Sequence, residues 1–200
     1  NDPRIDNKIK VVFIENYDVS KAELIIPAAD VSEQISTTTK EASGTGNMKL
    51  MMNGAITLAT LDGANIEIFD QVGEDNIVIF GLSANEVLNY NKFGGYSALD
   101  LYNSNRVIKR VVDDLVNGFI PNMEKEGRQI YDSLITYNDE YFVLRDMENY
   151  IEAQEKIDRL YKNKEKWNEM ALINIANSGV FSSDRTIAEY AEDIWFKGCE

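Results

Sequence analysis

Histidine is absent from this 200-residue chain, and cysteine is nearly absent. Without histidine, the chain cannot supply a Ser-His-Asp or Cys-His catalytic set, or a histidine-ligated metal site. Its single cysteine, Cys199, cannot form an internal disulfide, which is typical of a reducing compartment and predicts a cytoplasmic protein. No spacing of carboxylates resembles an EF-hand loop, so we expect no bound metal.

Positive charge is also scarce. The chain has 20 lysines and arginines against 34 aspartates and glutamates, for a net charge of −14. Proteins that bind nucleic acid neutralise its phosphates with clustered basic residues, and this chain has no basic run. No apolar run approaches the roughly 20 residues needed to span a bilayer. We therefore expect neither a nucleic acid nor a membrane as a partner.

Residues 1–83 alternate between short apolar runs and helical patterns, which is typical of a doubly wound parallel α/β sheet. The β-branched run Lys10–Ile14 predicts a buried parallel strand. The spacing of Ser20 and Glu23 is that of a capping box, and it predicts a helix that ends by Pro27. Further strands are predicted at 34–37, 56–59 and 77–80, and helices at 46–53, capped by Gly54, and at 64–72, ended by Gly73.

From residue 84 to residue 200 the pattern is helical. Ser83 and Glu86 form another capping-box spacing, and residues 182–184 provide N-cap candidates for a helix near the end. Two apolar stripes with steps of three and four predict amphipathic helices: Ile108, Val111, Val112, Leu115 and Phe119, and then Ile187, Tyr190, Ala191, Ile194 and Trp195. We expect the helical residues 84–200 to cover the sheet formed by residues 1–83 within one domain.

The most informative segment is the run Glu41–Lys49, a turn with two glycines between a carboxylate and a lysine. Glycines let backbone N–H groups approach an anion closely, and the start of a helix also favours negative charge. A lysine that is partly desolvated by apolar neighbours such as Leu50 is more easily neutral, and a neutral amine attacks an aldehyde to form an imine. A phosphate cradle beside an imine-forming lysine meets the requirements of pyridoxal phosphate.

Other phosphate-binding motifs fit this run less well. A dinucleotide fingerprint needs a third glycine where Lys49 stands, and a P-loop needs four residues between its glycines and then Lys-Ser or Lys-Thr. On the residues alone, a glycine-rich loop with a surface lysine remains an equal alternative.

The run and its surroundings resemble the pyridoxal-phosphate site of the glycogen/starch phosphorylase family, and the resemblance covers nearly the whole chain. The segments that carry it are Glu41–Lys49, Met52–Ala55, Asp62–Glu67, Glu15–Tyr17, Val19–Ser20, Ile26–Asp30, Ser32–Ser36, Asn177–Gly179, Phe181–Ile187 and Glu189–Ala191. The first of these is the most specific.

The resemblance implies a fold, an activity and a context. It implies the C-terminal part of a Rossmann-like, GT-B type sheet followed by a helical tail. The reaction would be the release of glucose 1-phosphate from α-1,4-glucan by inorganic phosphate, in an enzyme that is a homodimer. We expect the chain to be an excised fragment whose N-terminal part is missing, and to be inactive alone.

The resemblance also implies roles for individual residues. Lys49 would carry pyridoxal 5'-phosphate as an imine, and Gly44, Thr45, Gly46 and Tyr17 would help to bind this cofactor. The sugar would contact the run from Glu41 through Ala42 and Ser43 to Gly44.

Some residues depart from the family pattern, and other functions stay open. Asp18 stands where a basic or amide residue is frequent, and Thr38 and Thr39 replace smaller residues. Asp62 is typical of the family, but it could simply cap the next helix. The alternatives are a nucleotide-sugar glycosyltransferase of the same architecture, which would not need Lys49 as an imine, and a non-catalytic interaction domain with acidic faces.

Overall fold

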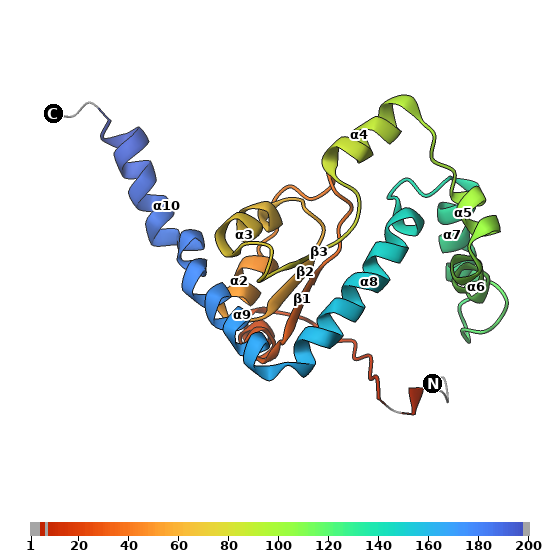
Figure 1. Ribbon diagram of the computed structural model, residues 1–200, viewed down its shortest axis with the longest axis horizontal. Coiled ribbons are helices and arrows are strands. Elements are labelled where there is room, and N and C mark those ends of the chain that lie inside the picture. The colour runs from red at the N-terminus through yellow and green to blue at the C-terminus, as the bar shows by residue number, and fades with distance from the viewer. Residues whose placement is uncertain (1–4, 7, 198–200) are drawn as a thin grey trace.

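A computed structural model describes residues 5, 6 and 8–197, and it contains a small parallel sheet with helices on both faces (Figure 1). In these residues the strands are β1 (Val31–Gln34), β2 (Ile56–Ala59) and β3 (Val78–Ile79), in the order β1-β2-β3. β1 pairs with β2 in the register Val31 to Ile56, and β2 pairs with β3 in the register Leu58 to Val78. The predicted α/β class with a parallel sheet is confirmed.

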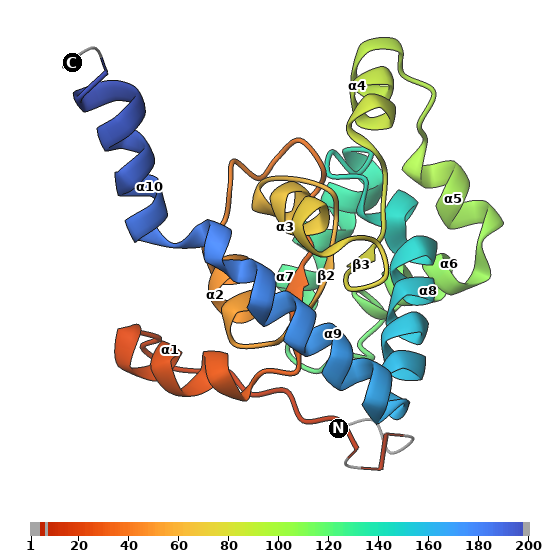
Figure 2. The same ribbon diagram turned by 60° about the vertical axis from the view of Figure 1, so that its left-hand side comes forward.

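The two faces of the sheet belong to different apolar clusters, because successive side chains of a strand point to opposite faces. Val78 and Phe80 lie in one cluster, while Ile77 and Ile79 belong to the other. The first cluster packs against α8 (Val143–Lys162), and the second packs against α2 (Gly46–Met52) and α3 (Ala64–Val72). Helix α9 (Lys164–Asn177) contributes side chains to both and crosses the molecule in Figure 2.

Several predicted boundaries agree with the structure. The strand at 56–59 and the helix at 64–72 are confirmed residue for residue, and Gly73 ends α3 at φ +75°. The helix predicted at 46–53 ends one residue earlier, with Asn53 as its C-cap and Gly54 following at φ +86°. The strand predicted at 77–80 is reduced to β3.

Three predictions for the region before residue 40 are wrong. Asp18, not Ser20, caps α1 (Val19–Ile25), because its carboxylate accepts a hydrogen bond from the Lys21 N–H at 2.9 Å. A 3-10 turn at Ile26–Ala28 follows. The strand predicted at 34–37 lies at 31–34 instead, since the chain leaves the sheet after Gln34.

The third wrong prediction is the buried strand at Lys10–Ile14. This run is extended coil, and its apolar side chains are solvent-exposed, with Val11 at 93% and Phe13 at 87%. An apolar run becomes a strand only where another strand pairs with it. Among the described residues, nothing pairs with this one.

The helical region begins with a confirmed capping box. The Ser83 hydroxyl accepts from the Glu86 N–H at the start of α4 (Ala84–Phe93), and the Glu86 carboxylate accepts from the Ser83 N–H. The remaining elements are α5 (Ala98–Ser104), α6 (Arg106–Asp114), α7 (Glu124–Tyr131), a π-helical turn at Asp132–Thr136, α8, α9, a 3-10 turn at Ser178–Phe181, α10 (Ser183–Tyr190) and a π-helical turn at Ala191–Trp195.

Only some of these helices cover the sheet. Helices α4 to α7 form small clusters around Val87 and Ile108 beside the start of α8. The predicted stripe at 108–119 is correct for Ile108 and Val112, but α6 stops before Leu115, and Phe119 is 52% exposed.

Helix α10 projects away from the sheet (Figure 1), and Ser182 caps it as predicted. The apolar stripe predicted at 187–195 runs from α10 into the π-helical turn that follows, and it stays largely exposed, with Ile187 at 52% and Ile194 at 65%. Within residues 5, 6 and 8–197, none of the helices has the length and apolar character required to cross a membrane.

Candidate functional site

The run Glu41–Lys49 lies in the connection between β1 and α2, which starts at the carboxyl end of β1, and extends into α2. The connection between β2 and α3, residues 60–63, starts at the same edge of the sheet, because β1 and β2 are parallel neighbours. This edge is where open α/β sheets bind their ligands. The two connections therefore form one loop cluster at the expected place for a site.

Backbone and carboxylate hydrogen bonds join the two loops. The Asp62 carboxylate oxygen Oδ2 accepts from the Lys40 N–H at 3.0 Å and from the Glu41 N–H at 2.8 Å. The Ala64 N–H donates to the Ser43 carbonyl at 2.8 Å. Sequence reasoning treated Asp62 as a possible cap of α3, but Gly63 occupies the N-cap position and Asp62 holds the other loop instead.

A buried pair of asparagines joins the helices that follow these loops. Asn47 Nδ2 in α2 donates to Asn65 Oδ1 in α3 at 2.9 Å, and Asn65 Nδ2 donates to the Thr60 carbonyl at 3.1 Å. Both side chains are at most 3% exposed. Sequence reasoning did not find this pair, although a polar residue at an inward-facing helix position is a signal for such a contact.

Two glycines of the loop cluster occupy positions where a side chain would not fit. A Cβ atom on Gly63 would lie 2.6 Å from the Ser43 carbonyl oxygen, so no other residue fits there. Gly44 has φ +84°, and a Cβ atom on it would lie 3.2 Å from the Asn47 amide. Gly63 thus permits the contact between the two loops, whereas Gly44 permits the left-handed backbone of the turn beside Asn47.

The residues predicted to bind the cofactor and the sugar line the outer side of this turn. Ala42, Ser43, Thr45 and Gly46 are exposed, and Gly44 is partly exposed. Thr45 is the N-cap residue of α2, and its hydroxyl makes no capping hydrogen bond within the described chain. Backbone groups and a hydroxyl are therefore accessible at the turn.

Lys49 lies in α2, one turn beyond Thr45, and its backbone N–H donates to the Thr45 carbonyl at 3.3 Å. Its side chain is exposed, whereas Met51 is fully buried in the cluster under α2. The expectation that apolar neighbours partly desolvate the lysine is therefore wrong for the described residues. Of the apolar residues that follow, Met51 is buried while Met52 is 37% exposed, and the lysine side chain beside them stays exposed.

Glu41 and Tyr17 differ in how firmly they are held. The Glu41 side chain is partly buried and accepts a hydrogen bond from the Ser36 hydroxyl at 3.1 Å, and the Ser36 carbonyl accepts from the Thr60 hydroxyl at 2.6 Å. Tyr17 precedes α1, is 60% exposed, and its hydroxyl makes no hydrogen bond to the described residues. The structure fixes Glu41 within the loop cluster and does not fix Tyr17 there.

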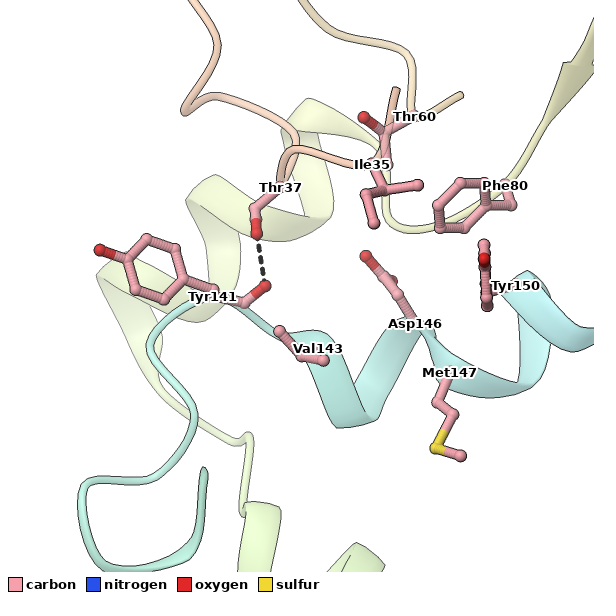
Figure 3. Close-up of a pocket in the computed structure, with 9 residues that line it drawn as sticks. All are labelled: Ile35, Thr37, Thr60, Phe80, Tyr141, Val143, Asp146, Met147 and Tyr150. Carbon is pink, nitrogen blue, oxygen red and sulfur yellow. Dashed lines mark hydrogen bonds between the residues drawn. The ribbon is translucent and has the colours of Figure 1, made fainter. Parts of the chain in front are cut away.

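A cavity of about 240 Å³ lies on the α8 side of the same sheet edge (Figure 3). Its lining comes from the ends of the strands and the first turns of α8: Ile35, Thr37, Thr60, Phe80, Tyr141, Val143, Asp146, Met147 and Tyr150. None of the residues predicted for the cofactor or the sugar lines it. The cavity adjoins the loop cluster but is a separate feature.

Asp146 is the buried carboxylate of this cavity, and Figure 3 shows it pointing from α8 toward Ile35. Its Oδ1 atom accepts from the Leu82 N–H at 2.9 Å, which ties the connection after β3 to α8. Burial raises the pKa of Asp146 to about 6, against the lowering effect of the Leu82 hydrogen bond.

The fold and the loop cluster together define a parallel α/β protein with a glycine-rich site at the carboxyl edge of its sheet. Residues 1–197 match the family model for carbohydrate phosphorylase, and the chain belongs to that family. It is 58% identical to glycogen phosphorylase of Bacillus subtilis (strain 168) over 194 residues, which cover 97% of this chain and 24% of that protein.

Human relatives are similar over the same extent. The liver form of glycogen phosphorylase from Homo sapiens is 48% identical, and the muscle form from Homo sapiens is 46% identical, each over 195 residues. These matches cover 98% of this chain and 23% of each relative. The chain thus spans about a quarter of the length of the curated relatives it matches.

Proposed function

We propose that this chain is the C-terminal, cofactor-binding part of a glucan phosphorylase of GT-B architecture. The reaction is the phosphorolysis of α-1,4-glucan by inorganic phosphate, with release of glucose 1-phosphate. Family membership supports this proposal, since the named relatives are glycogen phosphorylases. The single observation that carries it is that the run Glu41–Lys49 lies at the carboxyl edge of the parallel sheet, where such sheets bind ligands.

The cofactor of the proposed enzyme is pyridoxal 5'-phosphate, bound covalently to the Lys49 amine. The residues present fit this group in three respects. The Lys49 side chain is exposed, the Thr45 hydroxyl is free of a capping bond within the described chain, and Gly46 has open space where a Cβ atom would stand. Gly44, Thr45 and Gly46 would hold the 5'-phosphate through backbone N–H groups and the hydroxyl. Tyr17 would line the pocket.

The sugar would bind along Glu41, Ala42, Ser43 and Gly44. A carboxylate accepts hydrogen bonds from sugar hydroxyls, and backbone N–H groups donate to them. Because Ser36 and Asp62 hold Glu41 from two directions, its carboxylate is already oriented before a sugar arrives. Because the loop is already ordered, the entropic cost of ordering it does not reduce the affinity for the sugar.

When bound, the cofactor supplies a phosphate that exchanges a proton with the substrate phosphate. The chain's own residues position the groups: the turn at Gly44–Gly46 holds an anion, Lys49 fixes the cofactor, and Glu41 orients the sugar ring. Positioning and preorganised donors account for catalysis without a histidine or a metal ligand from this segment. We also propose that the enzyme is a cytoplasmic homodimer, in keeping with the family.

Borohydride reduction of the full-length protein tests the assignment of Lys49. We expect a fluorescent pyridoxyl group that peptide mapping locates at Lys49, and we expect the substitution Lys49→Ala to abolish it. Lys40→Ala is the matched control, because Lys40 lies in the same connection and should not affect labelling. A reducible pyridoxyl group retained in Lys49→Ala would refute the assignment.

A further inference from the structure

We propose that Asp62 is a positioning residue for the sugar-binding half of the site, and that it acts through the backbone of Glu41. This inference rests on the proposed function, because it assigns a role within the same site. Asp62 itself lies behind the loop, is 9% exposed, and directs its carboxylate toward the protein rather than toward the outer side of the turn.

The contact is specific for two consecutive peptide groups. A single oxygen, Oδ2, accepts from both the Lys40 N–H and the Glu41 N–H. A charged acceptor that binds two neighbouring N–H groups fixes the direction of the chain as well as its position. Asp62 thus holds the backbone N–H of Glu41 itself. The position of the Glu41 carboxylate therefore depends on Asp62.

Asp62 is itself held firmly. Its backbone N–H donates to the Thr60 carbonyl at 3.0 Å, and its carbonyl accepts from the Asn65 N–H at 3.1 Å. The backbone at Gly63 passes so close to the Ser43 carbonyl that a Cβ atom there would lie 2.6 Å from its oxygen, and the Ala64 N–H donates to the same carbonyl at 2.8 Å. The β2–α3 connection therefore supports the loop that carries Glu41 through several contacts.

Three contacts form this support, and the hydrogen bond from the Ala64 N–H to the Ser43 carbonyl is the middle one along the run. The other two lie on either side of it. Asp62 holds Lys40 and Glu41, at the start of the run, whereas Asn65 holds Asn47, in the first turn of α2. The Asp62 contact is next to the residues proposed for the sugar, and the Asn65 contact is next to those proposed for the cofactor. Removing the Asp62 carboxylate should therefore weaken sugar binding and leave the cofactor in place.

Substitution of Asp62 should not disturb the N-terminus of α3. The N-cap residue there is Gly63, and the Asp62 side chain makes no capping hydrogen bond to this helix. An effect of Asp62→Ala would therefore come from the loop contact and not from a damaged helix end.

The test is the kinetics of the full-length enzyme with glucose 1-phosphate and a maltodextrin primer. For Asp62→Ala we expect the KM for glucose 1-phosphate to rise at least tenfold, since loss of a hydrogen bond to a charged group such as the Glu41 carboxylate weakens binding by roughly 10- to 100-fold. Asp62→Asn keeps a neutral acceptor oxygen for the two N–H groups and should recover most but not all of this loss, which leaves KM roughly two- to fivefold above wild type. Cofactor content and borohydride labelling at Lys49 should stay unchanged in both variants.

Two controls make the result specific. Asp70→Ala removes a carboxylate from α3 that lies away from the two loops, and it should leave KM unchanged. In a Glu41→Gln background, adding Asp62→Asn should raise KM by a smaller factor than Asp62→Asn does in the wild-type enzyme. The reason is that the effects of residues that act as a unit are not additive.

The outcomes separate this proposal from the proposed function. An active wild-type enzyme in which Asp62→Ala has a KM within twofold of wild type would overturn the positioning role alone. If Asp62→Ala lost cofactor in parallel with activity, the positioning role would also be overturned, because the effect of the substitution would not be confined to sugar binding. If Asp62→Ala does not fold, Asp62→Asn decides: a KM within about 1.5-fold of wild type overturns the proposal. A wild-type enzyme without labelling at Lys49 would instead refute the proposed function.

Discussion

Thr39 is the residue of the loop cluster whose backbone is most unfavourable. Its φ is +78°, in the left-handed region that β-branched residues rarely adopt. The neighbours hold it there: the Thr38 hydroxyl donates to the Leu82 carbonyl at 2.8 Å, and the Lys40 N–H donates to Asp62. The β-branched side chain at Thr39 therefore carries a cost in backbone energy.

We therefore expect Thr39→Gly to raise the free energy of unfolding by about 1 kcal/mol. Glycine removes the penalty for the left-handed backbone, and the greater entropy of glycine in the unfolded chain offsets part of this gain. Its side chain is exposed and makes no hydrogen bond within the described residues, so little is lost with it. Urea unfolding monitored by circular dichroism measures the difference. Thr39→Ala, which keeps a Cβ atom, should recover less than half of the gain. A less stable glycine variant would contradict the assignment of strain.

At the scale of elements, Asp146 joins α8 to the connection between β3 and α4. Because burial raises the pKa of Asp146 to about 6, above its value of about 3.9 in an unfolded chain, the folded state binds this proton more tightly. The contribution of this group to stability is therefore fully present below about pH 4 and falls as the pH rises toward 6.

The substitution Asp146→Asn should remove this dependence, because the amide oxygen can still accept from the Leu82 N–H without a charge. We expect the variant to be more stable than wild type at pH 7, by on the order of 1–2 kcal/mol, and nearly equal to it at pH 4. Unfolding free energies between pH 4 and pH 8 measure this. Asp158→Asn, on an exposed position of the same helix, serves as the control. An equal difference at both pH values would show that titration is not its cause.

Elements that depend on nearby residues were predicted well. The capping box of α4 joins Ser83 to Glu86, three positions apart, and the length of α3 follows from its helical periodicity and from Gly73. The run at 10–14 was predicted wrongly because a strand depends on a partner, which its own residues do not specify. The N-cap of α1 was assigned to Ser20 on spacing alone, although Asp18 is an equally good capping residue.

In the candidate site, too, the features set by neighbouring residues could be predicted and those set by distant residues could not. The glycine turn and Lys49 could be found from one continuous run, and their assignment to a cofactor remains a prediction. The contacts that hold the turn could not be found in this way, because Asp62 and Asn65 lie about 20 positions further along the chain. Only the pairing of β1 with β2 brings them together.

At the scale of the whole molecule, the chain has a rigid loop cluster but little positive charge around it. The net charge is −14, and the lysines of the connection and of α2 are Lys40 and Lys49. The Lys40 amine already lies 3.4 Å from the Glu140 carboxylate. The proposed reaction brings two phosphates together, and desolvated anions need nearby cations or donors. The described residues supply these only in part.

We therefore expect the purified chain of residues 1–200 to form no glucose 1-phosphate from maltodextrin and inorganic phosphate, even with added pyridoxal phosphate. The relatives it matches are about four times longer, and the remaining three quarters of such a protein would have to provide further cations and the glucan surface. An enzyme-coupled assay for glucose 1-phosphate measures this, with the full-length protein as the positive control. Product formed by the chain alone, at a rate proportional to its concentration and lost in Lys49→Ala, would show that the loop cluster and its lysine suffice for catalysis.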